Sequence, residues 1–279
     1  MTLKKLLSEV LTEQEMQFVP TSFDIVGNKE KAVAIIEIPK ELESHKLKIA
    51  KTLMKKHKNV KSVLAKRAPR SGIYRLHDYE LLAGDKDTNV IHVESGCRFM
   101  LDPRKTYFST RESTERMRIA ELVQDKEVVA VFFAGIGPFA IVIAKKANPS
   151  LVIGIEINPD ATKYFRKNVI LNKLENVEVV EGDVKIHAPK YYQIADRVVM
   201  PLPETSHEFL EEAMNTLKPG GICHLYTFAS TKELIEKKQF IKQAAKHIGV
   251  GVDIGDAHKV LQWGPDIWKY RIDFKKSIV

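Results

Sequence analysis

From residue 127 onward in the 279-residue chain, glycines and carboxylates follow apolar stretches in a pattern that could hold a nucleotide. Gly135 and Gly137, in FFAGIGPFA, would let the backbone turn tightly and approach a ligand in front of helix amides. Glu156 comes twenty-one residues after Gly135, where a carboxylate can accept hydrogen bonds from both hydroxyls of a ribose. Asp183, directly after Gly182, could meet an adenine amino group. Each residue alone also fits a structural turn or a solvated strand end.

These positions lie in a regular alternation of strands and helices. The apolar run EVVAVFF at 127–133 predicts a strand that is covered on both faces. Further strands are expected at 151–157, 177–182, 196–202 and 220–228, and helices at 138–147, 160–173, 207–218 and 232–247. Asn158 and Pro159 give the second of these helices a cap and a first turn. With an antiparallel pair near 252–262 and 267–275, residues 106–279 are predicted to form a doubly wound α/β domain.

Residues 1–105 read as a separate small α+β domain. Strands are expected at 32–38, 60–67, 73–84 and 89–102, the last with a turn at Ser95 and Gly96. A short helix is expected within 1–16. An amphipathic helix is expected at 41–57, with Leu47 and Ile49 among the residues on its buried side.

The composition limits the classes to which the protein can belong. A net charge of +8 allows a polyanionic partner without demanding one. The two cysteines, Cys97 and Cys223, can form neither a disulfide framework nor a four-cysteine zinc site, which fits a reducing compartment. The nine histidines form no short ligand cluster, so no metal is expected. Without a signal peptide or a membrane-spanning apolar run, the sequence predicts a cytoplasmic protein with no membrane partner.

The glycine-rich turn separates two cofactor classes. A nicotinamide dinucleotide would call for a third glycine in G-x-G-x-x-G, and this chain has Ala140 there. Together with the antiparallel final strands, the sequence AGIG…IEINP…GD resembles the class I fold of methyltransferases that use S-adenosyl-L-methionine (SAM). The resemblance favours SAM over NAD.

Longer stretches carry a more specific resemblance. They read YFSTRESTERMRIAELV, FAGIGPFAI, IEINPDATKYFRKNVILNK and DRVVMPLPETSHEFLEEAM…KPGGICHLYTF. Together they resemble the archaeal and eukaryotic tRNA (guanine-37) N1-methyltransferase family and its wyosine-pathway relatives, and the similarity extends through the first domain. The resemblance implies SAM as cofactor and, as partner, a tRNA, expected to be tRNA-Phe, contacted at position 37 of the anticodon stem-loop. A monomer is favoured.

The resemblance also assigns roles to residues on the substrate side of the site. Glu115 falls at the family's general base for the guanine N1 proton, and Arg75 at the arginine that steadies guanine O6 as negative charge develops. Arg116 falls where an arginine approaches both cofactor and base, and Tyr107 at an aromatic that lines the methyl-donor pocket. Without the resemblance, these four residues would read as surface charges or core packing.

The cofactor side of the site takes up the positions found first. Glu156 would hold the ribose and Asp183 the adenine. The resemblance adds their neighbours Phe133 and Ile157, and it adds Pro201 and Pro203 from the turn after the fourth strand. Pro201 is expected to contact both the cofactor and the target base.

The chain departs from the family at two positions. Val131 replaces an aspartate that precedes the F-A-G-I-G run, and Pro201 replaces the asparagine of an Asn-Leu-Pro motif. Asparagine offers a donor and an acceptor, whereas the side chain of proline offers neither and leaves a wider, more apolar slot. A proline here resembles the archaeal subgroup that also methylates C7 of 4-demethylwyosine.

The sequence therefore predicts a SAM-dependent tRNA methyltransferase acting at position 37, on N1 of guanosine, on C7 of 4-demethylwyosine, or on both. Two alternatives stay open. One is the related aminocarboxypropyltransferase, which uses the same cofactor but transfers its other alkyl arm. The other is a non-catalytic RNA-binding protein.

Overall fold

The computed structural model describes residues 3–20, 22–68, 70 and 72–278. The chain packs as two units that divide between Thr110 and Arg111, whereas the sequence places a boundary near residue 105. Residues 106–110 belong to the first unit because their side chains pack there. The Thr106 hydroxyl donates to the carbonyl of Asp102 at 3.1 Å, and the rings of Phe108 and His92 lie 5.1 Å apart.

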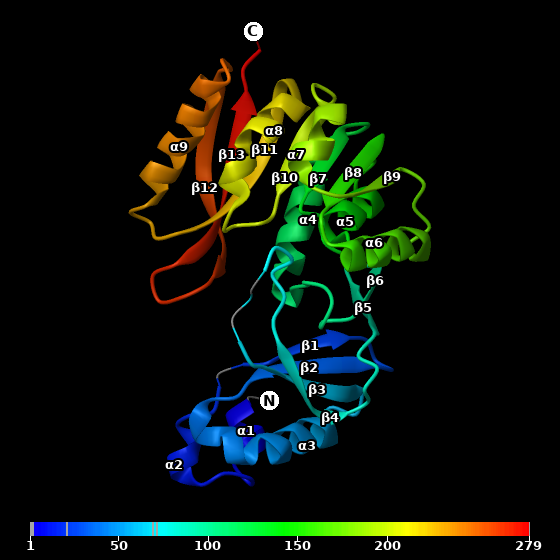
Figure 1. Ribbon diagram of the computed structural model, residues 1–279, viewed down its shortest axis with the longest axis vertical. Coiled ribbons are helices and arrows are strands. Elements are labelled where there is room, and N and C mark those ends of the chain that lie inside the picture. Colours follow the sequence, from blue (N-terminus) through cyan, green and yellow to red (C-terminus); the bar gives the residue numbers. More distant parts are fainter. Residues whose placement is uncertain (1–2, 21, 69, 71, 279) are drawn as a thin grey trace. The chain divides into compact units, whose positions relative to one another are not determined.

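The first unit is built on a four-stranded sheet in the order β1-β2-β3-β4 (Figure 1). Its strands span Asp24–Gly27, Ala32–Glu37, Val60–Lys66 and Tyr79–Gly84, and the pair β2/β3 is parallel. The helices α1 (Leu3–Leu7) and α3 (Lys46–Lys56) share a buried apolar core with this sheet. Helix α2 spans Glu13–Met16. A separate hairpin consists of β5 (Val90–Glu94) and β6 (Cys97–Leu101).

Two predictions for the first unit are wrong in detail. The expected strand at 73–84 begins only at Tyr79, because Gly72 and Arg75 both have positive φ and form a turn. The expected helix at 41–57 is divided into a 3-10 helix, η1 (Lys40–His45), and α3. Leu47 is 52% exposed, while Ile49 is fully buried.

The second unit contains a seven-stranded sheet in the order β12-β13-β11-β10-β7-β8-β9. The five parallel strands are β7 (Val128–Phe132), β8 (Leu151–Glu156), β9 (Val177–Glu181), β10 (Ala195–Met200) and β11 (Leu217–Ala229). Strand β13 (Trp268–Lys276) runs antiparallel to both β11 and β12 (Val252–Gln262). The order reverses between β7 and β10, and ligands of doubly wound sheets bind at such a reversal. The predicted fold class is confirmed.

Helices cover both faces of this sheet (Figure 1). One face carries α4 (Ser113–Leu122), α5 (Pro138–Lys146) and α6 (Pro159–Leu171), with the 3-10 turn η2 (Thr110–Glu112) just before α4. The other carries α7 (Val184–His187), α8 (Leu210–Thr216) and α9 (Leu234–His247), with 3-10 turns η3 (Ala188–Tyr191) and η4 (Ser206–Phe209). The predicted cap of α6 is confirmed, since the Asn158 side chain accepts from the amides of Asp160 and Ala161.

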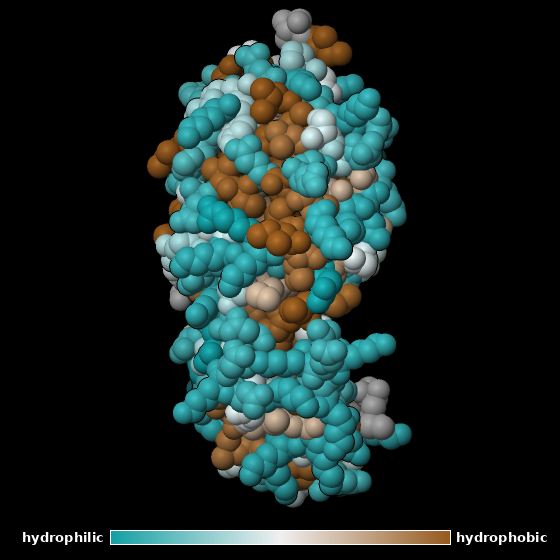
Figure 2. Space-filling model, turned by 90° about the vertical axis from the view of Figure 1, so that its right-hand side faces the viewer, coloured by the Kyte–Doolittle hydropathy of each residue, from teal (hydrophilic) through white to brown (hydrophobic). Residues whose placement is uncertain are grey.

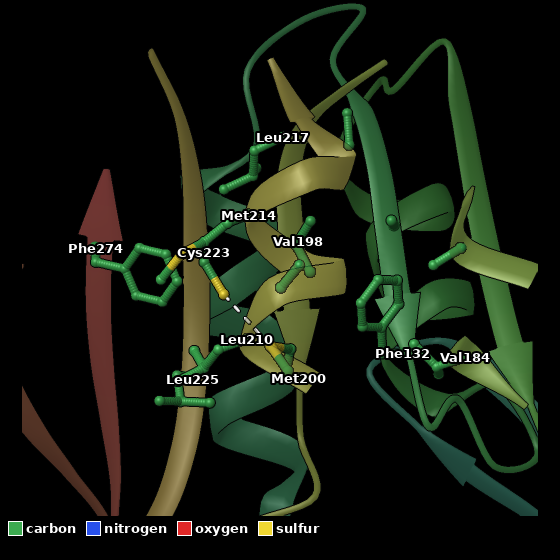
Figure 3. Close-up of a cluster of buried hydrophobic side chains, with 14 of the residues drawn as sticks. Phe132, Val184, Val198, Met200, Leu210, Met214, Leu217, Cys223, Leu225 and Phe274 are labelled. Carbon is green, nitrogen blue, oxygen red and sulfur yellow. Dashed lines mark hydrogen bonds between the residues drawn. The ribbon is translucent and has the colours of Figure 1, made fainter. Parts of the chain in front are cut away.

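The main apolar core lies between the sheet and helices α7 to α9 (Figure 3). Cys223 is buried there, with its sulfur 3.6 Å from the sulfur of Met200. Val131 is also fully buried, and its β7 neighbours Ala130 and Phe132 point to the opposite face, into this core. The strand around Val131 is therefore apolar on both sides.

The second unit also exposes apolar surface. Figure 2 shows a hydrophobic band along the side of this unit where β9 forms the edge of the sheet. Ile170 and Ile186, on the helices next to β9, are 76% and 71% exposed. In the part of the chain that the structure describes, no helix is long and apolar enough to cross a membrane.

Candidate active site

The turn after β7 has the tight backbone that the sequence predicts. Phe133, Gly135 and Gly137 all have positive φ, at 55°, 57° and 86°. A phenylalanine in this conformation is strained, and such strain concentrates at functional sites. The Ala134 amide donates to the carbonyl of Ile155 at 2.9 Å, so the turn is fastened to the neighbouring strand.

Glu156 is the carboxylate at the end of β8, and both of its oxygens are held by backbone amides. Oε2 accepts from the Gly135 amide at 2.7 Å, and Oε1 accepts from the Asn158 amide at 2.8 Å. Burial raises the pKa of Glu156, and hydrogen bonds from the amides of Asn158, Gly135 and Ile157 oppose this shift. A carboxylate has four acceptor positions, more than these three amides fill, so Glu156 can still accept from a ribose.

Gly137 has a second reason to be glycine besides its positive φ. A Cβ there would lie 2.1 Å from the Phe165 ring of α6, and a Cβ on Gly154 would lie 2.3 Å from the same ring. The Phe165 ring therefore fills a slot between these two glycines and brings α6 close to the sheet. The close packing of α6 is a further reason for glycine at position 137, and the contact of Gly137 with a cofactor stays a prediction.

Asp183 lies at the end of the third parallel strand. The amide of the preceding residue, Gly182, donates to the carbonyl of Glu156 at 2.8 Å. Asp183 is therefore next to a residue that is hydrogen-bonded to Glu156. Asp183 caps the short helix α7, with Oδ1 accepting from the Lys185 amide at 2.8 Å. Among the described residues Oδ2 has no hydrogen-bond partner, which leaves an acceptor for an amino group. We call Gly135, Glu156 and Asp183 the amide-held set.

Aromatic packing lies beside this set. The ring of Phe133 meets the ring of Phe209 edge-on, with centroids 4.8 Å apart, and the Lys185 ammonium lies 5.1 Å from the Phe209 ring. Ile157 is half-buried next to Glu156. The structure therefore places Phe133 and Ile157 next to the amide-held set.

Glu115 lies in the first turn of α4 and is 2% exposed. Its Oε1 accepts from the Tyr226 hydroxyl at 2.8 Å and from Nη1 of Arg271 at 2.9 Å. Tyr226 and Arg271 are directly opposed on β11 and β13. Oε2 accepts from Arg118 at 3.1 Å, and the Arg118 side chain is 52% exposed. One carboxylate oxygen is thus fixed by buried donors, and the other accepts from a half-exposed arginine.

A second carboxylate precedes Glu115 by three residues and meets a buried lysine. Lys269 of β13 donates to Oε2 of Glu112 at 2.9 Å and to the carbonyl of Pro201 at 3.2 Å. The Lys269 ammonium also lies 4.9 Å from the ring of Tyr226. We call Glu112, Glu115, Tyr226, Lys269 and Arg271 the ion-paired set. It connects the start of α4 with the turn that holds Pro201.

The network continues along the sheet through residues that sequence analysis missed. Arg271 also donates to Asp273 at 2.9 Å, and Asp273 Oδ1 lies 2.7 Å from Nδ1 of His224. Nε2 of His224 lies 2.6 Å from Nη1 of Arg197, which pairs with Glu127 at 2.8 Å. These residues are far apart in sequence. The signal that could have found them is the polar residues at alternate positions of the last strand, WKYRIDF.

The remaining predicted residues divide between the two units. Arg116 is 1% exposed in α4, beside Glu115. Pro201 and Pro203 are half-buried in the turn after β10. In the first unit, Arg75 has a positive φ of 51°, and the guanidinium of Arg70 lies 4.2 Å over the ring of Tyr107. The roles of Arg75 and Tyr107 stay predictions.

Charge is distributed unevenly between the units. Residues 1–110 carry a net charge of +6 and residues 111–279 carry +2. Within the described ranges, no group of three or more His, Cys, Asp or Glu side chains could hold a metal ion. The first unit therefore has the stronger attraction for a polyanion.

The sheet order and the carboxylate that ends β8 define a class I methyltransferase fold. The TRM5/TYW2 methyltransferase domain family matches residues 90–253, and the TYW2 N-terminal domain family matches residues 3–88. The chain belongs to the TRM5/TYW2 methyltransferase family, as the sequence motifs predict.

Characterised relatives include enzymes of both expected kinds. The tRNA (guanine(37)-N(1))-methyltransferase Trm5b of Pyrococcus abyssi is 41% identical, over 95% of this chain and 78% of its own. The tRNA 4-demethylwyosine(37)-methyltransferase Taw21 of Saccharolobus solfataricus is 35% identical, over 79% and 82%. A tRNA(Phe) (4-demethylwyosine(37)-C(7)) aminocarboxypropyltransferase of Pyrococcus horikoshii is 31% identical, over 98% and 95%. The crystal structure of P. horikoshii TYW2 in complex with MeSAdo superposes with a TM-score of 0.82 at 29% identity, over 99% and 98%.

Proposed function

We propose that this chain uses SAM to methylate the nucleoside at position 37 of a tRNA, at N1 of guanosine, at C7 of 4-demethylwyosine, or at both. The chain is a SAM-dependent tRNA-modifying enzyme of the TRM5/TYW2 family. The observation that carries the proposal is the Glu156 carboxylate, which is held on both oxygens by backbone amides next to the glycine-rich turn. tRNA-Phe is the expected substrate, and the cell's cytoplasm is the expected compartment.

The amide-held set fits the cofactor. Glu156 would accept hydrogen bonds from the two ribose hydroxyls, and Oδ2 of Asp183 would accept one from the adenine amino group. Phe133 and Ile157 would supply apolar contacts to the adenosine. When bound, SAM supplies a methyl group on a positively charged sulfur, which a nucleophilic nitrogen or carbon of the base can accept.

Glu115 is proposed as the group that takes the proton from N1 of guanine. A general base must lie within hydrogen-bond reach of that proton with a free acceptor position. Oε1 is fixed by Tyr226 and Arg271, whereas Oε2 is held by Arg118, whose side chain is half-exposed. Arg118 is the solvent-accessible partner of this oxygen, so its side chain can move aside when the base binds. Oε2 is therefore the oxygen that we assign to proton transfer.

The turn at Pro201 is proposed to hold the target base. Proline presents no polar side-chain group there, and its carbonyl is already taken by Lys269. The slot beside it is thus less polar than one lined by asparagine, which suits the larger tricyclic base. The roles of Arg75 at guanine O6, of Arg116 towards base and cofactor, and of Tyr107 in the methyl-donor pocket stay proposals from the family resemblance.

A second candidate is transfer of the 3-amino-3-carboxypropyl group of SAM to C7 of 4-demethylwyosine. The observation that favours it is the match of residues 3–88 to the TYW2 N-terminal domain family. This candidate uses the same amide-held set, and it differs in which carbon of the cofactor is transferred.

The test is mass spectrometry of position-37 nucleosides after incubation with SAM and either unmodified tRNA or tRNA that carries 4-demethylwyosine. A gain of one methyl group supports the proposal, and the nucleoside shows which reaction occurs. A gain of one aminocarboxypropyl group establishes the second candidate instead. If neither product forms and calorimetry detects no SAM binding, the result favours a non-catalytic RNA-binding protein.

A further inference from the structure

Lys269 is a buried lysine whose ammonium joins three elements of the second unit. The residue is 3% exposed. Its Nζ donates to Glu112, just before α4, and to the carbonyl of Pro201, just after β10. The same atom lies 4.9 Å from the ring of Tyr226 on β11. A buried ammonium persists only when it is paired, so these contacts define one geometry.

The contact with Pro201 is made through the main chain. Proline has no amide hydrogen and no polar side chain, so its carbonyl is the group that can orient it. At the other end of the turn, the Ser206 amide donates to the carbonyl of Leu202 at 3.2 Å. The Ser206 hydroxyl donates to the carbonyl of Tyr226 at 2.8 Å. Both ends of the 201–206 turn are thus attached to β11 and β13.

We propose that Lys269 is a positioning residue that fixes the 201–206 turn relative to α4 and so sets the width of the slot for the target base. Glu112 and Glu115 lie about one helical turn apart, so the lysine that holds Glu112 also sets where Glu115 stands relative to Pro201. The width of the slot then depends on two features: the residue at position 201, and the ion pair between Lys269 and Glu112, which lies outside the slot. The assignment to a base slot rests on the proposed function, whereas the role of Lys269 in fixing the 201–206 turn does not.

The same strand provides a matched control. Lys276 of β13 also donates to two carbonyls, of Met214 and Leu217, at 2.8 and 2.9 Å. Burial lowers the pKa of Lys276. It anchors the end of α8 to the start of β11, away from the 201–206 turn. Replacing Lys276 removes a comparable structural contact without touching the turn.

The experiment compares Lys269→Met, the double variant Lys269→Met with Glu112→Gln, and Lys276→Met in the full chain. Hydrogen exchange reports on the Ser206 amide, calorimetry gives the dissociation constant for SAM, and single-turnover assays with saturating SAM and tRNA give the transfer rate. We expect both Lys269 variants to exchange the Ser206 amide faster. We also expect them to transfer roughly 10- to 100-fold more slowly, the size of effect that a misplacement of about 1 Å produces. Their SAM affinity should not change, and Lys276→Met should keep both wild-type exchange and wild-type rate.

Unchanged Ser206 exchange in the Lys269 variants would overturn the proposal, and so would an equal loss of rate in Lys276→Met. If Lys269→Met alone does not fold, the double variant carries the test, because it leaves no carboxylate charge facing the apolar side chain. If the wild-type chain transfers no group from SAM, the proposed function fails. Ser206 exchange would then still decide whether Lys269 holds the turn.

Discussion

Glu156 and Glu115 are both almost completely buried carboxylates of the second unit, but different kinds of groups hold them. Glu156 is held by backbone amides, the farther of which, Gly135, is 21 residues away. Glu115 is held by the side chains of Tyr226 and Arg271, which are 111 and 156 residues away. Backbone amides keep their place when side chains change, whereas the ion-paired set can be retuned by single substitutions.

This difference suggests how the work is divided within one domain. The amide-held set would bind a cofactor that is the same for every reaction of the family. The ion-paired set borders the turn at Pro201, which we propose holds the target base. The relatives are named for different target bases. Conserving the first arrangement while varying the second would change the substrate without losing the cofactor.

Glu115→Gln is expected to have the largest effect. It removes the proposed proton acceptor, so N1 methylation of guanosine should fall by about 10²- to 10⁴-fold, the usual contribution of general-base catalysis. Single-turnover rates with saturating SAM measure this. Methylation at C7 loses its proton from a differently placed carbon and should depend less on Glu115. SAM affinity serves as the control, and a matching loss there would remove the distinction between the two sets.

Glu156→Ala should impair the amide-held set and so weaken the binding of SAM. It removes charge-assisted hydrogen bonds to the ribose, so SAM binding should weaken by roughly 1.5–3 kcal/mol. Calorimetry measures the dissociation constant. Because burial raises the pKa of Glu156, wild-type affinity should be complete above that pKa and decline as pH falls through it. Glu156→Gln should bind weakly with little dependence on pH in the acid range, and an unchanged dissociation constant in Glu156→Ala would refute the ribose site.

The network around His224 should make the free energy of unfolding of the chain depend on pH. Burial lowers the pKa of His224, although the neighbouring Asp273 opposes this shift. The unfolded chain therefore binds this proton at a higher pH, near 6.5 for an unperturbed histidine. The free energy of unfolding should be highest above that value and should decline as pH falls towards the folded pKa, by about 1.4 kcal/mol per unit of pKa difference.

Urea unfolding across this pH range measures the effect. His224→Gln is the matched variant, because glutamine can accept from Arg197 and donate to Asp273 without titrating. The pKa of Asp273 is lowered: burial raises it, but the hydrogen bond and charge of His224 and the charge of Arg271 outweigh burial. The Asp273 carboxylate adds to the free energy of unfolding above its pKa in the unfolded chain. This contribution is lost as the pH falls through its pKa in the folded chain. It therefore has the same sign as the effect of His224 but acts at lower pH. Identical pH curves for wild type and His224→Gln would exclude His224 as the source.

The smallest effect is expected outside both sets. Lys55 is exposed on α3 of the first unit, which carries most of the net charge. If it meets a tRNA phosphate, Lys55→Gln should reduce the salt dependence of tRNA binding by about one released counterion, or roughly three- to fourfold in affinity between 50 and 200 mM salt. Lys242→Gln, on exposed α9, is the control. If tRNA affinity depends equally on salt concentration in wild type and Lys55→Gln, Lys55 does not contact a tRNA phosphate.

The same contrast explains how much the sequence could predict. Gly135, Glu156 and Asp183 can be proposed from the sequence because strand ends and turn residues are local features. The helices and strands of the second unit follow from hydrophobic periodicity. Lys269 and His224 were missed because their importance depends on which strands pair. Arg75 was placed in a strand because its left-handed backbone leaves no trace in the residue pattern. The packing of Phe165 against Gly137 cannot be predicted from the residue pattern, because it depends on how α6 packs on the sheet.

The central claim is that the turn at Pro201 selects the base while the amide-held set serves either reaction. The most direct test gives the wild-type chain and Pro201→Asn an equal mixture of unmodified tRNA and tRNA carrying 4-demethylwyosine, with saturating SAM, and measures both methylated nucleosides by mass spectrometry. Asparagine narrows the slot and restores a donor and an acceptor suited to guanine. We predict that Pro201→Asn lowers C7 methylation of the tricyclic base while N1 methylation of guanosine is kept or increased. An equal fall in both products, or an unchanged ratio between them, would contradict the claim.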